Sequence, residues 1–396
     1  MATTRGKTAL AAGLALQVLL ASCGDRDTPE PIRPTPPIPQ RAPITHVSGE
    51  RPATKPDEAP KPDEAPKPEE TERPEVPLVF PSRWQRATEF PGRLGVALRA
   101  PWRRLAPQVD EIEIPSSADG STQRALFYDS GTTHAKPLLV VLHSWSSSYL
   151  QNIHIPYAHF AIENDWVFLH PNFRGPNRNA EATLSELAVR DVLDAVEHAK
   201  SRAHVDPSRI YLLGYSSGAM MALVLAGREP QQWAGVAAWV AVYDLADWYA
   251  EVPGMRYASD IRAACGGAPH PGSDAEAECR RRSPEGWLHA AAGLTPVLVA
   301  HGVDDRLASV AHAIRAFNAL AAPEDRVGDP ELREIAERGT IPAPLRATEH
   351  DVSWSEAGVP VVLSRRSQAA TLVLFRGEHD MFYRPGLEWL ARQRRR

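Results

Sequence analysis

The sequence lacks the marks of several common classes of protein. Its formal net charge is only −5, and no basic stripe stands out that would indicate a nucleic-acid partner. Its histidines are scattered without a ligand spacing such as His-Glu-x-x-His, so the sequence predicts neither a metal site nor a cofactor. Beyond its amino-terminal end, no apolar run is long enough to predict a membrane-spanning helix.

A short targeting signal opens the chain. Two basic residues precede an apolar run, residues 8–20, which is too short to span a bilayer alone and fits a secretory signal. The next residues, Leu20-Ala21-Ser22-Cys23, resemble the lipobox of bacterial lipoproteins. The resemblance implies that residues 1–22 are removed and that Cys23 is acylated. The chain would then lie in the cell envelope, outside the cytoplasm, anchored by lipid to a bacterial membrane. The alternative is a plain signal peptide with a chance cysteine.

Residues 23–90 read as a tether. Many of the 37 prolines lie here, mixed with Glu, Asp and Lys, and a six-residue repeat runs through Lys55–Pro60 and Lys61–Pro66. Such a segment cannot bury a core and should remain extended and solvated. At about 3.1 Å per residue it could hold a domain up to roughly 200 Å from its anchor. The remaining residues, 91–396, are predicted to form one folded domain.

The folded part alternates strand and helix patterns. Glu111–Ile114 and Ala125–Tyr128 predict an antiparallel hairpin. Continuous apolar runs predict strands that are buried on both faces, at Leu138–Leu142, Trp166–Leu169, Ile210–Leu213, Val297–Ala300 and Leu372–Phe375. Helical patterns lie between them, at Leu184–Ala199, Gly218–Leu225 and Val310–Leu320. This alternation predicts an α/β fold with a mostly parallel central sheet and helices on both faces.

Two segments do not fit that alternation. Residues 242–290 could be a cap inserted over the edge of the sheet, and residues 327–360 are rich in charge and turn formers. The first segment contains Cys265 and Cys279. In an oxidising compartment this pair could close a disulfide loop that contributes roughly 3 kcal/mol, and otherwise the two would be partly buried thiols.

A candidate nucleophile stands in a strand-turn-helix context. Gly214-Tyr215-Ser216-Ser217-Gly218 follows a predicted strand and precedes an apolar helix. In this G-x-S-x-G pattern the turn forces the serine into a strained conformation and exposes its oxygen at the carboxyl end of the sheet. A serine hydroxyl needs a base to become a good nucleophile, so further residues are expected later in the chain.

The expected acid and base follow the last two predicted strands. His301-Gly302-Val303-Asp304-Asp305 follows one strand, and the pattern H-G-x-x-D favours Asp305 over Asp304 as the acid. His379 follows the last strand and is the candidate base, which would take the proton of Ser216 and return it to the leaving group. A surface histidine, or a metal site with Glu378 and Asp380, is the alternative reading of His379.

An oxyanion hole needs two backbone N–H groups. Ser217, which follows the nucleophile, should supply one. The turn after the strand at 138–142 should supply the other, and Trp145 is the expected donor, although it could instead be a wall of the pocket. Related enzymes often carry His-Gly in this turn, whereas this chain has His143-Ser144.

Together these blocks resemble the catalytic domain of the prolyl oligopeptidase family and its related carboxylesterases, over about residues 108–390. The resemblance rests on the order of the triad and on further blocks, namely Pro171–Gly175, Asp191, Asp194, Val205–Ile210 and Arg282–Pro284. It implies an α/β-hydrolase fold, a serine hydrolase and a small-molecule or short-peptide substrate. Family peptidases often carry a β-propeller before this domain, where this chain has its tether. Ala219-Met220-Met221 stands where they commonly have Gly-Gly.

Three functions follow from this reading. A serine peptidase of the prolyl oligopeptidase type should hold a substrate ammonium with acids at the pocket mouth, for which Glu378 and Asp380 are candidates. A carboxylesterase for acyl sugars should have an aromatic groove, with candidate side chains Trp145, Tyr215, Trp354 and Phe382. A non-catalytic binding module on a hydrolase scaffold is the third, although such proteins usually lose a triad member. Fold analogy alone does not identify the substrate.

Overall fold

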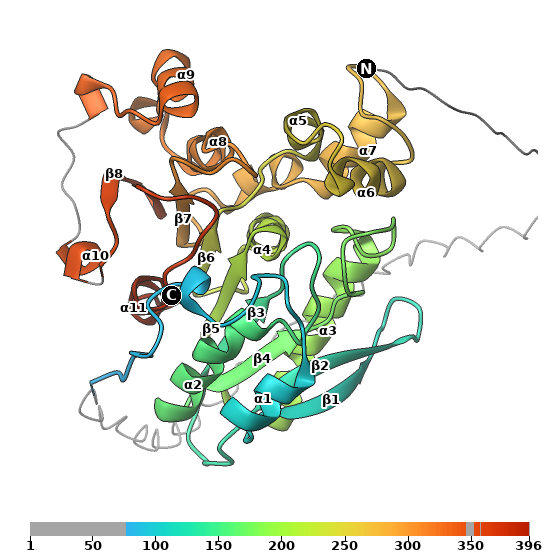
Figure 1. Ribbon diagram of the computed structural model, residues 1–396. Helices are drawn as coiled ribbons and strands as arrows, with labels where there is room; N and C mark the ends of the chain where they lie inside the picture. Colours follow the sequence, from blue (N-terminus) through green and yellow to red (C-terminus); the bar gives the residue numbers. More distant parts are fainter. Residues whose placement is uncertain (1–76, 346–351, 357, 396) are drawn as a thin grey trace, which may run out of the picture. The chain divides into compact units, whose positions relative to one another are not determined.

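A nine-stranded sheet runs through the part of the chain that the computed structural model describes, which is residues 77–345, 352–356 and 358–395 (Figure 1). Its strand order is β1-β2-β4-β3-β5-β6-β7-β9-β8. The strands from β4 to β9 in this order run parallel, whereas β1, β2 and β8 pair antiparallel with their neighbours. The bounds are β1 Asp110–Pro115, β2 Thr122–Tyr128, β3 Lys136–Leu142, β4 Val167–Pro171, β5 Val205–Tyr215, β6 Gly235–Trp239, β7 Val297–Gly302, β8 Val361–Ser367 and β9 Ala370–Phe375.

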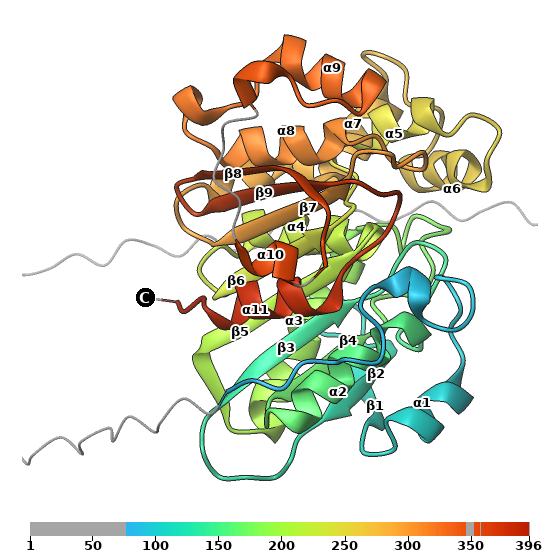
Figure 2. The same cartoon turned by 60° about the vertical axis from the view of Figure 1, so that its left-hand side comes forward.

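The central strands are buried on both faces, as their continuous apolar runs predict. In β3, Leu138, Val140 and Leu142 join one hydrophobic core, while Leu139 and Val141 join another on the opposite face. Helices cover each face (Figures 1 and 2). One face carries α3 (Glu186–Arg202), α4 (Ser217–Arg228) and α8 (Ala311–Leu320), and the other carries α2 (Ile155–Glu163) and α11 (Tyr383–Ala391). The predicted α/β fold with a mostly parallel sheet is therefore confirmed, and none of the described helices is long and apolar enough to span a membrane.

Residues 242–290 form a helical insertion between β6 and β7. Its helices are α5 (Leu245–Glu251), α6 (Arg256–Cys265) and α7 (Asp274–Arg282). A disulfide joins Cys265, at the end of α6, to Cys279 in α7, with their Cα atoms 5.2 Å apart. Of residues 327–360, the structure describes α9 (Asp329–Arg338) and α10 (Val352–Glu356), while residues 346–351 and 357 lie outside the described part.

The folded part begins earlier than the sequence predicted. Residues 77–90 were assigned to the tether, but Trp84, Ala87 and Phe90 are buried in a core on the same face as α2. The rings of Trp84 and Phe90 pack with their centroids 4.6 Å apart. The boundary predicted at residue 91 is therefore wrong, because an apolar cluster near the end of the proline-rich stretch joins the core. The signal peptide, Cys23 and the rest of the tether lie outside the described residues.

This boundary predicts a large difference between two truncated chains. A chain that begins at residue 91 should unfold at lower denaturant than one that begins at residue 77. It leaves the partners of Trp84 and Phe90 exposed, and losing a buried large aromatic side chain typically costs about 3–5 kcal/mol. Urea unfolding of both chains measures the difference, with the full chain as reference. Equal midpoints would show that residues 77–90 contribute nothing to the core.

Candidate active site

Four loops meet at one edge of the sheet. β3, β5, β7 and β9 are parallel and end at Leu142, Tyr215, Gly302 and Phe375. The carboxyl ends of parallel strands share one edge, where ligands bind in open α/β sheets. The residues that the sequence singled out follow these ends directly, so the topology gathers Trp145, Ser216, Asp305 and His379 at a common edge.

Ser216 occupies a sharp turn between β5 and α4. Its backbone lies at φ 58° and ψ −120°, a strained conformation for a residue with a side chain. Its N–H donates to the carbonyl of Trp239 at 2.9 Å, which ties the turn to β6. A Cβ at Gly218 would lie 2.0 Å from the carbonyl oxygen of Leu142, and one at Gly214 would lie 2.2 Å from that of Gly218. The two glycines of the pattern are therefore required by the close passage of the backbone.

Asp305 and His379 form a close pair. His379 Nδ1 lies 2.6 Å from Asp305 Oδ2, and the Asp305 side chain is fully buried. The N–H groups of Leu307 and Ala308 donate to its other oxygen at 2.8 and 3.1 Å. Burial alone would raise the pKa of Asp305, but hydrogen bonds from His301 and His379 outweigh it and hold that pKa far below its usual value. The carboxylate is therefore charged at neutral pH and accepts a hydrogen bond from the N–H at His379 Nδ1.

Asp304 has a different set of partners. Its oxygens accept from Arg376 at 2.9 Å and from the N–H of Gly377 at 3.1 Å. The chain before His379 crosses close above Gly302, where a Cβ would lie 2.3 Å from the carbonyl oxygens of both Gly377 and Glu378. Asp304 thus fastens the loop of His379, whereas Asp305 contacts the ring itself.

His379 Nε2 is available to act as a base. Because Asp305 can only accept, Nδ1 carries the ring proton, and Nε2 of the neutral ring is an acceptor. Nε2 is buried and has no hydrogen-bond partner among the described residues, Ser216 included. Catalytic hydrogen bonds are often long in free enzymes and tighten when substrate binds. The hydroxyl of Tyr215 donates to the carbonyl of His379 at 2.9 Å, so the elbow and the loop of His379 are linked.

The two expected oxyanion donors lie in loops that are joined to each other. The N–H of Ser144 is taken by the side-chain oxygen of Gln151 at 2.7 Å, while the N–H groups of Trp145 and Ser217 have no acceptor in the described part of the chain. Asn177 links the two loops: its N–H donates to the carbonyl of Trp145 at 2.8 Å, and its side chain donates to Ser217 Oγ at 2.9 Å. Asn177 stands in a turn two residues after Gly175 and carries no motif of its own, so the sequence alone does not single it out.

The aromatic side chains proposed to line a groove are instead packed. Trp145, Tyr215, Trp354 and Phe382 are each exposed by only 2–3%. The indole N–H of Trp145 donates to Asp260 of the insertion at 3.0 Å. The sequence reveals that a residue is aromatic but not whether its ring faces a cavity, so the groove built from these four residues is not formed.

The two acids proposed to hold a substrate ammonium differ from each other in burial. Asp380 is buried and accepts from the N–H and hydroxyl of Thr88 at 3.1 and 2.5 Å. It serves the fold rather than a pocket mouth. Glu378 is exposed. No group of three or more His, Cys, Asp or Glu side chains within the described ranges is arranged to hold a metal ion.

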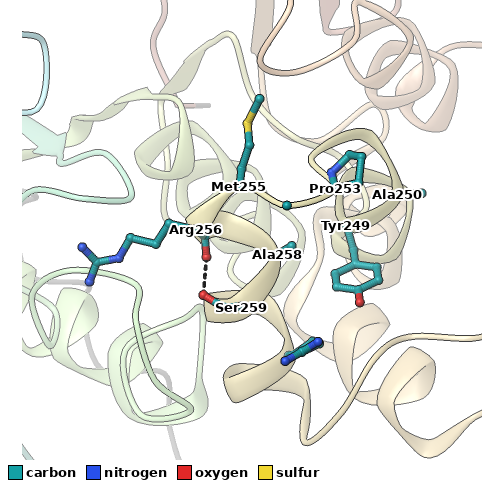
Figure 3. A pocket seen from close by; sticks show the side chains of 9 residues that line it. Tyr249, Ala250, Pro253, Met255, Arg256, Ala258 and Ser259 are labelled. Carbon is teal, nitrogen blue, oxygen red and sulfur yellow. Dashed lines mark hydrogen bonds between the residues drawn. The ribbon is translucent and has the colours of Figure 1, made fainter. Parts of the chain in front are cut away.

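A surface pocket of about 470 Å³ lies at the turn between α5 and α6 (Figure 3). Its lining includes Tyr249, Met255 and Arg256. Their chain neighbours Trp248 and Tyr257 pack on the ring of Trp145, with centroids 5.0 and 6.3 Å away. With some residues the insertion therefore contacts Trp145, in the loop expected to supply an oxyanion donor, and with their neighbours it lines this pocket. In Figure 3 the side chain of Arg256 points away from Tyr249, so the two do not converge on one ligand position.

Residues 158–336 match the model of the prolyl oligopeptidase family. The matched region contains Ser216 and Asp305, and His379 lies beyond it. A comparison with curated proteins gives no match.

Several solved peptidases are similar to this chain at low identity. An acylaminoacyl peptidase of Pyrococcus horikoshii is 13% identical, with a TM-score of 0.46 over 68% of this chain and 37% of its own. A puromycin-hydrolysing peptidase of Mycobacterium tuberculosis is 16% identical, with a TM-score of 0.43 over 55% and 34%. A post-proline cleaving enzyme of Rickettsia typhi is 18% identical, with a TM-score of 0.42 over 52% and 30%. The chain thus spans about a third of the length of these solved chains.

Proposed function

We propose that this chain, which carries a prolyl oligopeptidase family domain at residues 158–336, is a serine peptidase that cleaves amide bonds through an acyl-enzyme on Ser216. The observation that carries the proposal is the contact of 2.6 Å between Asp305 and His379, at the sheet edge where the strained Ser216 turn also lies. Short peptides are the substrates that the family match favours.

The geometry suits acyl transfer in two steps. His379 Nε2 would take the proton of Ser216 Oγ while that oxygen attacks the substrate carbonyl carbon. The N–H groups of Ser217 and Trp145 would donate to the oxygen that becomes negative in the tetrahedral intermediate. Asp305 stabilises the imidazolium form of His379, which gives its proton to the leaving amine as the C–N bond breaks. A water molecule, activated by the same histidine, then hydrolyses the ester on Ser216.

Two other functions remain as alternatives. The same machinery would hydrolyse carboxylic esters, but the aromatic side chains expected for an acyl-sugar groove are packed inside the domain. A non-catalytic binding module would not need the buried Asp305–His379 pair, whose formation requires a charged carboxylate in the interior. The peptidase proposal therefore has more support than either alternative.

A fluorophosphonate probe tests the proposal directly. The full chain should be labelled, and the Ser216→Ala variant, folded to the same extent by circular dichroism, should show no labelling. Parallel panels of aminoacyl or prolyl amides and of short acyl esters then separate the peptidase from the esterase. Labelling that persists in Ser216→Ala, or a folded chain that is not labelled, would contradict the catalytic proposal and favour the binding module.

We also propose that the domain works outside the cytoplasm, tethered to a membrane through Cys23. Two observations support this location. The sequence Leu20–Cys23 resembles a lipobox, and the domain has a disulfide between Cys265 and Cys279, a bond that persists in oxidising compartments. Cys23 itself lies outside the described residues.

A further inference from the structure

The first folded segment after the tether crosses the loop that carries His379. We call residues 84–98 the strap. Its backbone pairs with the residues that follow His379: the N–H of Ala87 donates to the carbonyl of Met381 at 2.9 Å, and the N–H of Tyr383 donates to the carbonyl of Gln85 at 3.0 Å. This short antiparallel contact also joins Arg86 to Phe382. The strap therefore pairs, backbone to backbone, with the loop that carries His379.

Two side chains of the strap reach Asp380, the residue next to His379: Thr88 by a hydrogen bond, and Arg86 by a longer ion pair of 3.8 Å. Asp380 accepts from the N–H and the hydroxyl of Thr88 and from its neighbour Met381 at 2.9 Å. The Asp380 side chain is only 7% exposed, and burial raises the pKa of its carboxyl group. A buried carboxylate needs donors, and Thr88 supplies two of them. The direction of the chain at His379 thus depends on a threonine of the strap.

The strap is itself firmly held at both ends. Trp84 and Phe90, which flank Thr88 in the sequence, are buried in the core. Toward the end of the strap, the N–H of Asn152 donates to the carbonyl of Val96 at 2.9 Å, and the side-chain amide of Gln151 donates to the carbonyl of Leu94 at 2.7 Å. Gln151 is the same residue that takes the N–H of Ser144, beside the expected oxyanion donor. A segment fixed in this way can hold a neighbouring loop in place.

We propose that Thr88 is a positioning residue, which acts on His379 through Asp380. The inference rests on the proposed function, since it concerns how the base of that reaction is held. The strap fixes Thr88, Thr88 fixes Asp380 by two hydrogen bonds, and Asp380 sets where the adjacent imidazole lies relative to Ser216. A small misplacement of a base slows proton transfer without changing substrate binding.

The test is Thr88→Val in the full chain. Valine keeps the shape of the exposed threonine and its backbone N–H, and removes only the hydroxyl donor to Asp380. We expect kcat to fall roughly tenfold, with KM unchanged, on whichever of the amide and ester panels the unmodified chain hydrolyses. The rate of fluorophosphonate labelling should fall by the same factor. Thr88→Ser, which keeps the hydroxyl, should restore the rate.

Thr132→Val is the matched control. Thr132 is also exposed, and its hydroxyl also donates to an aspartate, Asp165, at 3.1 Å. Thr132 precedes the start of β3 and Asp165 precedes the start of β4, so this pair lies at the edge of the sheet opposite to His379. This variant should keep the full rate. Urea unfolding of each variant allows rates to be compared per folded molecule.

The outcomes separate the two proposals. If the unmodified chain is not labelled, the proposed function fails before the strap is tested. If it is labelled and Thr88→Val reacts at the same rate per folded molecule, or if Thr132→Val loses as much, the positioning role is overturned. An increase in KM at constant kcat would likewise overturn it, because it would place Thr88 in substrate binding.

Discussion

Asp305→Asn should lower kcat about ten-thousand-fold while leaving the fold intact. The Asp305 side chain is fully buried and contacts His379 Nδ1 at 2.6 Å. An amide removes the negative charge that stabilises the imidazolium form, and its NH₂ group can hold the ring in the tautomer that leaves Nε2 protonated. A base protonated at Nε2 cannot take the proton of Ser216. Steady-state kinetics on the active panel, with circular dichroism as the test of folding, measures the effect.

Asp304→Asn is the paired control. Asp304 is the neighbouring acid, with a side chain that is 41% exposed, and it contacts Arg376 and Gly377 rather than the imidazole. Its replacement should change kcat by no more than about threefold, because asparagine keeps an oxygen that accepts from Gly377, and the exposed ion pair with Arg376 contributes little. If Asp304→Asn were the more damaging of the two, the acid would have to be reassigned to Asp304.

The strands that the sequence predicted are those with continuous aliphatic runs. Leu138–Leu142 and Val297–Ala300 are interior strands whose residues must be apolar on both faces, and a continuous apolar run can be read directly from the sequence. β6 was missed because Gly235–Trp239 is rich in alanine, which favours helix as readily as a buried strand. β8 was missed because it is an edge strand and contains Arg365 and Arg366 near its end.

The candidate site divides along similar lines. Ser216, Asp305 and His379 could be located because each follows a strand end, and parallel topology brings such ends together. Asn177 and Thr88 could not be found, since their contacts depend on how loops far apart in sequence pack against each other. The same limit explains the errors at Tyr215 and Phe382, whose residue types suit a groove as well as a core. Burial is a property of the assembled sheet and its helices, which local sequence does not encode.

Acid should destabilise this domain well before its carboxylates titrate, because three histidines are buried without charge. His143, His154 and His170 are fully buried behind the oxyanion loop. Burial lowers the pKa of His143 to about 4 and that of His170 to about 3, and it holds the pKa of His154 well below its usual value. The unfolded chain has histidines of ordinary pKa, near 6.5, so it binds more protons than the native state between pH 6.5 and 4.

The hydrogen bonds of His154 and His170 fit neutral rings, whereas His143 is kept neutral by its burial alone. His170 Nδ1 donates to the carbonyl of Val141 at 2.6 Å, so its Nε2 accepts from His154 Nδ1 at 3.1 Å. That leaves His154 Nε2 as a buried acceptor without a donor in the described residues. A proton there would be a buried positive charge next to two other imidazoles, and no carboxylate of the described residues contacts it. Unfolding relieves this restriction by letting all three rings take up protons in water.

Each histidine therefore contributes stability that is complete above pH 6.5 and is lost as the pH falls toward its folded pKa. The loss is about 1.4 kcal/mol per pH unit for each group. Three groups together predict a decrease of roughly 5 kcal/mol in the free energy of unfolding between pH 6.5 and 5, because the full slope is reached only below pH 6.5. Urea unfolding at half-unit intervals of pH measures this slope directly.

His154→Asn separates the cluster from a general effect of acid. Asparagine can still donate to His170 Nε2 but does not titrate, so the slope of stability against pH should fall by about one third, whatever the variant costs at pH 7.5. His270→Asn, at an exposed position, should leave the slope unchanged. A stability that is flat from pH 6.5 to 5, or a slope that His154→Asn does not reduce, would mean that these rings carry charge in the folded state. The buried network would then have to supply an acceptor for each added proton. The carbonyls of Asn172 and Ser144 could do so for His143, since they lie 2.7 Å from its Nε2 and 3.1 Å from its Nδ1.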